Sequence, residues 1–285
     1  MPYEFEKEKI YRMPTHFGPS LGPRQGPNGR KFECKDFPKS TAYSVSFLTN
    51  PQQLEKLLPP GFFLDKEPLI TVTASYIKEI EWLAGRGYNT LGVSFPAIFQ
   101  GGKDYASGNF LTVLWENLTD PILTGREELG ISKIFCDLPE PKSHNGEINC
   151  EASWMGFKFM DLIVKDMVKI ESSEFSEPDN LSDDKSLTGI LHYKYIPETG
   201  GFPGSWGEKD IAYAVLTPSS NSNQVIQKIW KGEGEVNFHR ARWEDLPTQY
   251  TIVNTFNQLE IIEITGSTIT KTVGAKDISD QRILL

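Results

Sequence analysis

Residues 124–134 read Thr124-Gly125-Arg126-Glu127-Glu128-Leu129-Gly130-Ile131-Ser132-Lys133-Ile134. The pattern predicts a short helix that ends at Gly130, because glycine commonly stops helices, and a strand that begins near Lys133. Ile131 and Ile134 flank the lysine, so the strand is apolar. Burying an ammonium is costly, and a lysine in such a strand has two solutions. It extends its ammonium to the surface, or it loses the proton and becomes a nucleophile.

Around this stretch, most segments alternate apolar and polar residues with a period of two, which is typical of strands. We predict strands at 43–47, 69–80, 91–99, 109–116, 132–138, 147–155, 157–164, 188–196, 210–217, 235–242 and 258–271. Short helices are expected at 51–58, where Asn50 suits the N-cap, at 120–129 and at 223–230. Without a βαβ rhythm, the fold class is mostly antiparallel β (α+β). A sheet this large must hide its edges, so we expect a closed, barrel-like or cone-like core.

The 285 residues predict one large domain at 41–285, preceded by an extended arm at 1–40 that is punctuated by proline and glycine. The arm is expected to lie over the body of the fold or over a partner subunit. Segment 172–187 is acidic and rich in serine, which predicts a solvated loop.

The net charge of −9 argues against nucleic acid and anionic membrane as partners. No apolar run reaches the length of a membrane span, and the start lacks the apolar segment of a secretory signal. The three cysteines, Cys34, Cys136 and Cys150, lack CxxC spacing, and the four histidines lack paired spacing. We therefore expect reduced thiols, a cytoplasmic location and no metal site.

The segment around Lys133 resembles the acetoacetate decarboxylase family, whose motif is Gly-Arg-Glu, five variable residues ending in proline, then two lysines. Gly125, Arg126 and Glu127 match, and Lys133 falls on the first lysine, which in that family forms a Schiff base with a β-keto acid. The stretches 54–59, 67–69 and 87–99 look like further blocks of the family. The resemblance covers residues 40–165 best. It implies an acetoacetate decarboxylase-like fold, a reaction without a cofactor, and a homo-oligomer.

Several polar positions of the family are replaced in this chain. The second lysine is Ile134 and the proline is Ser132. The family's two acidic positions fall on Thr90 and near Thr73, and its arginine falls near Ser40. The resemblance therefore implies the family fold and the Schiff-base lysine with a different substrate or reaction.

Candidate site residues follow from these losses. Glu79 or Glu81 can replace the missing acid/base beside Lys133. The residues that can bind a substrate are Arg86, Tyr88, Arg126, Glu127, Trp115 and Trp154, together with Glu116 and Phe157 as cavity-lining residues. Each has a structural alternative: residues 79–89 form an exposed hairpin anchored by Trp82, Arg126 and Glu127 pair or cap the helix, and the aromatic residues belong to the core. His192 and His239 lie on predicted strands, where a lone histidine is usually structural.

Two functions compete. The first is a cofactor-independent lyase that forms an imine at Lys133 with a small carbonyl substrate, such as a keto acid, or with a larger apolar compound of secondary metabolism. Decarboxylation, aldol chemistry with dehydration, and cyclisation share that intermediate. The second is a non-covalent binding protein, or a template-type cyclase, that uses the same apolar β cavity for a hydrophobic small molecule. A thiol enzyme built on Cys136 is a distant third, since no histidine is near it in sequence.

Overall fold

The computed structural model describes residues 4–171, 187–200 and 207–285, and its strands form one large sheet. The strands are β1 (Lys39–Leu48), β2 (Phe62–Leu64), β3 (Leu69–Ile80), β4 (Arg86–Gln100), β5 (Tyr105–Glu116), β6 (Lys133–Phe135), β7 (Lys142–His144), β8 (Glu147–Trp154), β9 (Phe157–Ile170), β10 (Thr188–Pro197), β11 (Lys209–Pro218), β12 (Val225–Phe238), β13 (Glu263–Val273) and β14 (Arg282–Leu284). The helices are α1 (Pro51–Glu55), α2 (Thr119–Thr124) and α3 (Tyr250–Asn257), with short turns η1 (Thr15–Phe17), η2 (Pro27–Gly29), η3 (Glu81–Leu83), η4 (Gly125–Leu129) and η7 (Ile278–Asp280). No helix in these ranges is both long and apolar enough to cross a membrane.

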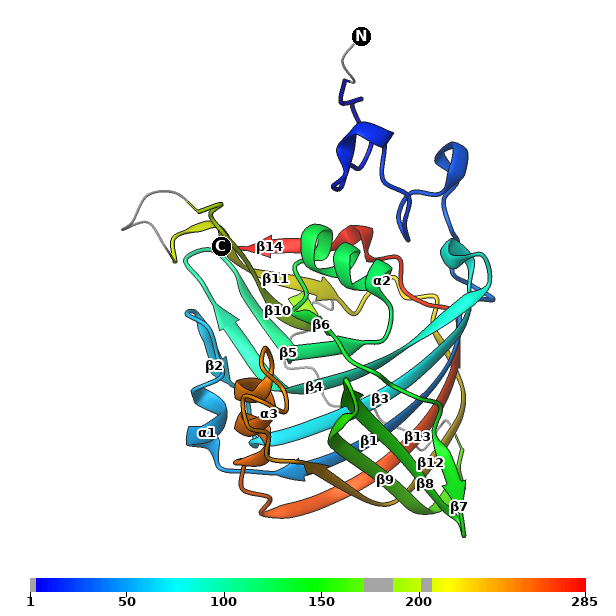
Figure 1. The fold of residues 1–285 in the computed structure, drawn as a ribbon, viewed down its shortest axis with the longest axis vertical. Coiled ribbons are helices and arrows are strands. Elements are labelled where there is room, and N and C mark those ends of the chain that lie inside the picture. Colours follow the sequence, from blue (N-terminus) through cyan, green and yellow to red (C-terminus); the bar gives the residue numbers. More distant parts are fainter. Residues whose placement is uncertain (1–3, 172–186, 201–206) are drawn as a thin grey trace.

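The sheet has the order β14-β11-β10-β5-β4-β3-β1-β13-β12-β9-β8-β7, and it curves strongly around the core (Figure 1). Nearly all neighbouring strands are antiparallel, and only β5 pairs in parallel, with β10 and with β6. The mostly antiparallel fold class is therefore confirmed. The expected closure is not made by hydrogen bonds in the described part of the chain, because the end strands β14 and β7 do not pair.

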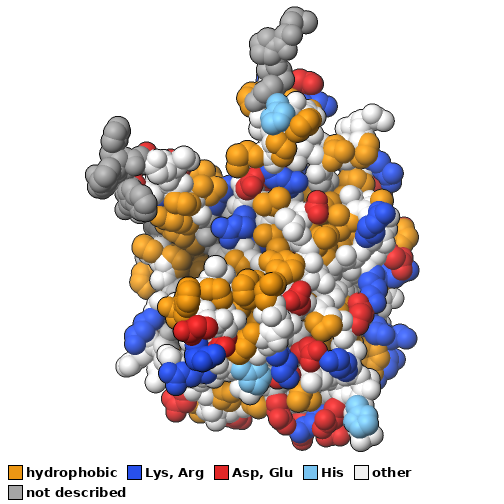
Figure 2. Space-filling view, viewed as in Figure 1, with side chains coloured by type: hydrophobic (Ala, Val, Ile, Leu, Met, Phe, Trp, Pro, Cys, Tyr) orange, Lys and Arg blue, Asp and Glu red, His pale blue; other side chains and the backbone are white. Residues whose placement is uncertain are grey.

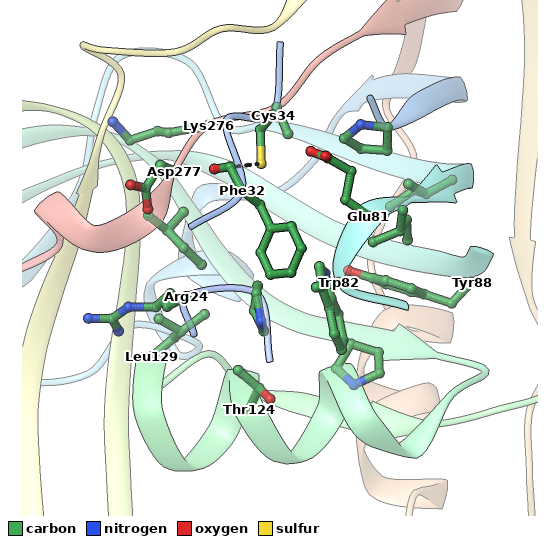
Figure 3. A pocket seen from close by; sticks show the side chains of 18 of the residues that line it. Arg24, Phe32, Cys34, Glu81, Trp82, Tyr88, Thr124, Leu129, Lys276 and Asp277 are labelled. Atoms are coloured by element: carbon green, nitrogen blue, oxygen red, sulfur yellow. Dashed lines mark hydrogen bonds between the residues drawn. The ribbon is translucent and has the colours of Figure 1, made fainter. Parts of the chain in front are cut away.

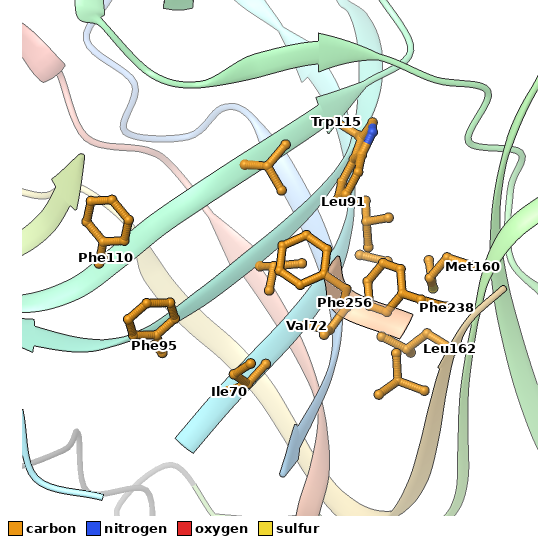
Figure 4. Close-up of a cluster of buried hydrophobic side chains, with 14 of the residues drawn as sticks. Ile70, Val72, Leu91, Phe95, Phe110, Trp115, Met160, Leu162, Phe238 and Phe256 are labelled. Carbon is orange, nitrogen blue, oxygen red and sulfur yellow. The ribbon is translucent and has the colours of Figure 1, made fainter. Parts of the chain in front are cut away.

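The concave face of the sheet holds the hydrophobic core, which Figure 4 shows. Trp115 of β5 is fully buried there, against the rings of Phe159, Phe238 and Phe256. Its indole N–H donates to Gln249 Oε1 over 2.7 Å, as a buried polar group requires. Helix α3, which the sequence patterns did not predict, packs its apolar side into this face (Figure 4).

The opposite face of the sheet carries different residues, because side chains alternate along a strand and paired residues share a face. Thr90 of β4 lies opposite Glu116 of β5. Lys133 of β6 lies beside Leu114 of β5, two residues from Glu116. The lysine and the glutamate therefore project from the same face, away from the hydrophobic core around Trp115.

Most predicted elements are found, including α1 with Asn50 as its N-cap and the end of η4 at Gly130, whose φ is +74°. The helix predicted at 223–230 is wrong. That segment begins β12 and pairs with β13, so its apolar residues serve a sheet rather than a helix face. The strand predicted at 258–271 begins five residues later, at Glu263. The loop predicted at 172–187 falls almost wholly outside the described residues.

The described part of the N-terminal arm, residues 4–38, contains only short turns and an isolated bridge. Its first part projects from the body at the top of Figure 1. Its second part is held against the chain's C-terminal region, where Gly274 N donates to Pro38 O over 2.9 Å and Ala275 N to Cys34 O over 2.8 Å. The arm thus comes to lie over the face that carries Lys133.

Substitution Gln249→Leu is expected to lower the free energy of unfolding by about 1–3 kcal/mol, because the buried indole of Trp115 loses its acceptor. The Phe135 carbonyl also loses the N–H that reaches it from Gln249 over 2.9 Å. Urea denaturation measures the change, with the exposed Gln227→Leu as control. Equal stabilities of the two variants would contradict this role for Gln249.

Candidate active site

Lys133 lies at the start of β6 and is 6% exposed. Its ammonium does not reach the surface. Nζ is 2.8 Å from Glu116 Oε1 and donates to the Pro121 carbonyl over 3.1 Å. The lysine is therefore a buried group with one carboxylate and one carbonyl as partners.

The residues of the Gly-Arg-Glu motif position this lysine. Gly125 has no side chain where the stem of Lys133 passes: a Cβ there would lie 2.2 Å from Cδ and 2.8 Å from Nζ. Arg126 donates from a guanidinium nitrogen to the Lys133 carbonyl over 2.9 Å. The glycine therefore makes room for the stem, and the arginine holds the backbone from which the stem leaves.

Glu116, at the end of β5, supplies the carboxylate of the pair. Its side chain is 1% exposed, and Oε1 is within ion-pair distance of Lys133, but neither oxygen has a partner in hydrogen-bond geometry among the described residues. Burial raises the pKa of Glu116, and the neighbouring Lys133 opposes that rise without cancelling it. Thr90, which stands where the resemblance placed a family glutamate, lies directly across the strand pair. The acidic group of this site thus comes from the adjacent strand.

The lysine faces a cavity of about 200 Å³ whose walls are mostly apolar (Figure 3). The sheet and η3 contribute Ile77, Ile80, Glu81, Trp82 and Tyr88, and the helical segment contributes Pro121, Thr124, Gly125 and Leu129. The arm adds Pro23, Arg24, Phe32, Cys34, Phe37 and Pro38, and the C-terminal region adds Ala275, Lys276, Asp277 and Ile278. The cavity is therefore closed only where four separate parts of the chain meet.

Two predicted site residues, Tyr88 and Glu81, line this cavity. Burial, and then the charge of Glu116, raise the pKa of Tyr88, so its hydroxyl stays protonated. The Glu81 carboxylate lies 3.5 Å from Arg30 of the arm. Figure 3 shows Tyr88 and Trp82 on one wall, with the ring of Phe32 between them and Arg24.

Two other predicted residues of the 79–89 segment point elsewhere. Glu79 pairs with Lys39 at 2.7 Å, in a separate groove on the other side of β3's end. Arg86 is exposed and donates to the Leu83 carbonyl over 3.3 Å. Neither is among the residues that line the Lys133 cavity.

The structure also places four predicted binding residues outside the cavity. Trp115 is in the core and Trp154, at the end of β8, packs against it. Glu127 presents its carbonyl to Lys194 over 2.6 Å. Arg126 lines a different cleft, of about 530 Å³ and bordered by α3, β5, β6 and β10. Hydrophobic side chains gather beside α3 on this face of the molecule (Figure 2).

His192 and His239 have structural partners, and Cys136 is buried. His192 is fully buried with Nδ1 3.0 Å from the Gly130 carbonyl, and His239 Nε2 is 2.6 Å from Asp161 Oδ2. Cys136 is fully buried, and its burial raises the pKa of the thiol. The described residues contain no group of three His, Cys, Asp or Glu side chains placed to hold a metal ion.

The sequence patterns missed the pairing of Glu116 with Lys133 and the contribution of the arm. One signal existed for Glu116, because an acidic residue follows Leu114-Trp115 at the end of an apolar strand. No signal existed for Phe32 or Arg24, which reach the cavity through tertiary contacts alone.

Residues 12–275 match the family model of acetoacetate decarboxylase (ADC). The chain belongs to the acetoacetate decarboxylase family. No curated protein sequence matches it.

Several solved structures share the fold at low sequence identity. The acetoacetate decarboxylase of Legionella pneumophila aligns with a TM-score of 0.64 and 14% identity over 91% of this chain and 92% of its own. The enduracididine biosynthesis enzyme MppR, complexed with the condensation product of pyruvate and imidazole 4-carboxaldehyde, aligns with a TM-score of 0.58 and 16% identity over 92% and 98%. An acetoacetate decarboxylase-like enzyme from Sphingomonas wittichii aligns with a TM-score of 0.58 and 16% identity over 88% and 94%.

Substitution Gly125→Ala is expected to displace the Lys133 side chain, because the added methyl occupies the space of its stem. We expect the rate at which an amine-reactive reagent labels Lys133, measured by mass spectrometry, to differ by about fivefold or more between this variant and the native protein. The matched control is Gly102→Ala, where a Cβ meets nothing within 4 Å. Identical labelling in both variants would show that Gly125 does not shape the lysine's position.

His192 makes stability depend on pH. Burial lowers its pKa from 6.5 to about 4, so the unfolded chain binds more protons than the folded chain between these values. Stability should therefore fall as the pH falls from 6.5 toward 4, by about 3 kcal/mol in total. His192→Gln should remove this slope in denaturant titrations at several pH values, and the exposed His144→Gln should keep it. If the pH dependence of stability persists in His192→Gln, other groups cause it.

Proposed function

We propose that the protein is a cofactor-independent enzyme of carbon–carbon chemistry, which forms a Schiff base between Lys133 and the carbonyl of a keto acid or a related metabolite. The observation that carries the proposal is the buried ion pair of Lys133 and Glu116 beneath an apolar cavity. Family membership supports an enzyme with lyase or decarboxylase-type chemistry.

The first requirement is a neutral amine, since only the unprotonated amine attacks a carbonyl. An ordinary lysine, with a pKa of about 10.4, is neutral in roughly one molecule in two thousand at pH 7. In the pair, the proton can pass from Nζ to Glu116 Oε1 across 2.8 Å and leave two neutral groups. Burial disfavours the carboxylate and raises the pKa of Glu116, which favours this exchange.

The second requirement is a proton for the departing oxygen. The neutral amine of Lys133 adds to the substrate carbonyl, and the resulting carbinolamine must lose its hydroxyl as water. Protonated Glu116 returns its proton to that hydroxyl and becomes a carboxylate beside the cationic iminium. Tyr88, which keeps its proton, can donate a hydrogen bond to the same oxygen from the cavity wall. No external acid is required.

The iminium then accepts electrons from a bond β to the nitrogen. Loss of carbon dioxide, cleavage of an aldol, or addition of the enamine to an aldehyde all proceed from this point. The MppR complex contains a condensation product of pyruvate and an aldehyde, which supports condensation as a reaction to test beside decarboxylation. The replaced acidic positions of the family, Thr90 and Thr73, support a reaction other than acetoacetate decarboxylation.

Borohydride trapping tests this proposal. The protein is incubated with acetoacetate, pyruvate and larger β-keto acids, reduced, and mapped by mass spectrometry. We expect a reduced adduct on Lys133, none in Lys133→Met, and a rate of formation at least tenfold lower in Glu116→Gln, because a barrier increase of about 1.4 kcal/mol already gives tenfold. The exposed Lys209→Met is the matched control.

An absence of adduct across the panel, with native folding confirmed, would contradict the proposal. The cavity would then be a non-covalent site for a hydrophobic small molecule, and direct binding measurements would replace trapping. An adduct that forms equally fast in Glu116→Gln would support the Schiff base at Lys133 but contradict the proposed role of Glu116.

A further inference from the structure

A second cavity, of about 220 Å³, adjoins the Lys133 cavity and is polar. The two cavities share Arg24 and Leu129 in their walls. The remaining wall of the second cavity consists of Glu128, Lys194, Tyr213, Val215, Ser279, Gln281, Arg282 and Ile283. With Arg24 included, three side chains that line the second cavity are basic, and one, Glu128, is acidic.

Lys194 of β10 is the most informative of these residues. It is 7% exposed, and its Nζ donates to the Glu127 carbonyl over 2.6 Å. No carboxylate of the described residues lies within 4.0 Å of this ammonium. Burial lowers the pKa of Lys194, and the charges of Glu128 and Glu127 oppose this fall without cancelling it.

The backbone at Gly130 leaves space for the Lys194 side chain. A Cβ on Gly130 would lie 2.5 Å from the Cβ of Lys194 and 2.8 Å from its Cδ, and Gly130 adopts a left-handed conformation with φ +74°. The glycine therefore leaves room for the Lys194 stem in the same way that Gly125 leaves room for Lys133. Both buried lysines lie against the same short segment, 125–130.

Arg24 adds a second cation without an ion pair. It makes none within 4.0 Å to the described residues, and Figure 3 shows its guanidinium turned away from Phe32 and Trp82, so that it leaves the Lys133 cavity. Arg282, the third cation, is paired with Asp104 at 2.7 Å. Glu128, the acidic group of the wall, lies 3.9 Å from Arg12. Burial raises its pKa, although the charges of Arg12, Arg24 and Lys194 oppose the rise.

We infer that the second cavity is an anion subsite, which binds a carboxylate or phosphate group through Lys194 and Arg24. Guanidinium and ammonium groups form their strongest hydrogen bonds with these anions. The hydroxyl groups of Tyr213 and Ser279 lie in the same wall as further donors. Because the subsite adjoins the Lys133 cavity, the substrate class is a carbonyl compound with an anionic group at its far end, such as a dicarboxylic keto acid or a phosphorylated keto compound. This last step rests on the proposed function.

Anion binding is tested first, with inorganic phosphate as the probe and chloride at equal ionic strength as the reference. Phosphate should raise the melting temperature of the native protein and of Lys209→Met, because a ligand of the folded state stabilises it. In Lys194→Met, phosphate should bind at least tenfold more weakly. The same variant should melt no lower than the native protein without phosphate, since it removes a buried cation that has no carboxylate of the described residues within 4.0 Å.

Two results would overturn the subsite. One is a phosphate-dependent rise that is the same in Lys194→Met, or absent in the native protein. The other is a lower melting temperature of Lys194→Met without phosphate, together with an unchanged phosphate response. Lys194 would then have only a structural role through the Glu127 carbonyl.

The link to Lys133 is tested by borohydride trapping with 2-oxoglutarate and pyruvate. Phosphate should slow adduct formation with 2-oxoglutarate at least fivefold more than with pyruvate, and Lys194→Met should lower the ratio of the two adducts at least tenfold. Phosphate that binds without affecting this ratio would overturn the inferred substrate class. If neither keto acid forms an adduct, the Schiff base fails, while the phosphate titration still decides the anion subsite.

Discussion

The buried ion pair of Lys133 and Glu116 is the constraint on which the rest of the site depends. Two charges placed in an apolar environment must stay together, because either one alone would lack most of the stabilisation that water provides. The sheet meets this requirement through register: β5 places Glu116 on the face away from the core, and the parallel pairing of β6 brings Lys133 beside it. The same proximity lets one proton be shared between them, which connects the stability of the fold to the proposed chemistry.

The glycines of segment 125–130 make room for the stems of two lysines in this chain. Gly125 accommodates the stem of Lys133, and Gly130 accommodates the stem of Lys194. One short helical turn thus separates two buried lysines with different surroundings. Lys133 has a carboxylate partner and an apolar cavity, whereas Lys194 has a backbone carbonyl and a polar cavity. We propose attack on a carbonyl for the first environment and the binding of an anion for the second.

The chain preserves the family fold while it changes the polar groups around the lysine. Thr90, where the resemblance places an acidic residue of the family, lies directly opposite Glu116 and its carboxylate. The N-terminal arm contributes Phe32 and Arg24 to the cavity wall, so the residues that would contact a substrate come from a region with little regular structure. Such an arrangement allows substrate preference to change without disturbing the sheet.

The sequence by itself determined most of the strands, the antiparallel class, the start of α1, the end of η4, and Lys133 as the residue to examine. These follow from side-chain periodicity, capping and a motif, all of which are local in the chain. It could not determine that the strand at 225–238 replaces a helix, or that Glu116 rather than Glu79 meets the lysine. It could not place Arg24 and Lys194 beside one cavity. Those outcomes depend on strand register and, for Arg24 and Lys194, on contacts between segments more than a hundred residues apart, which only the tertiary structure decides.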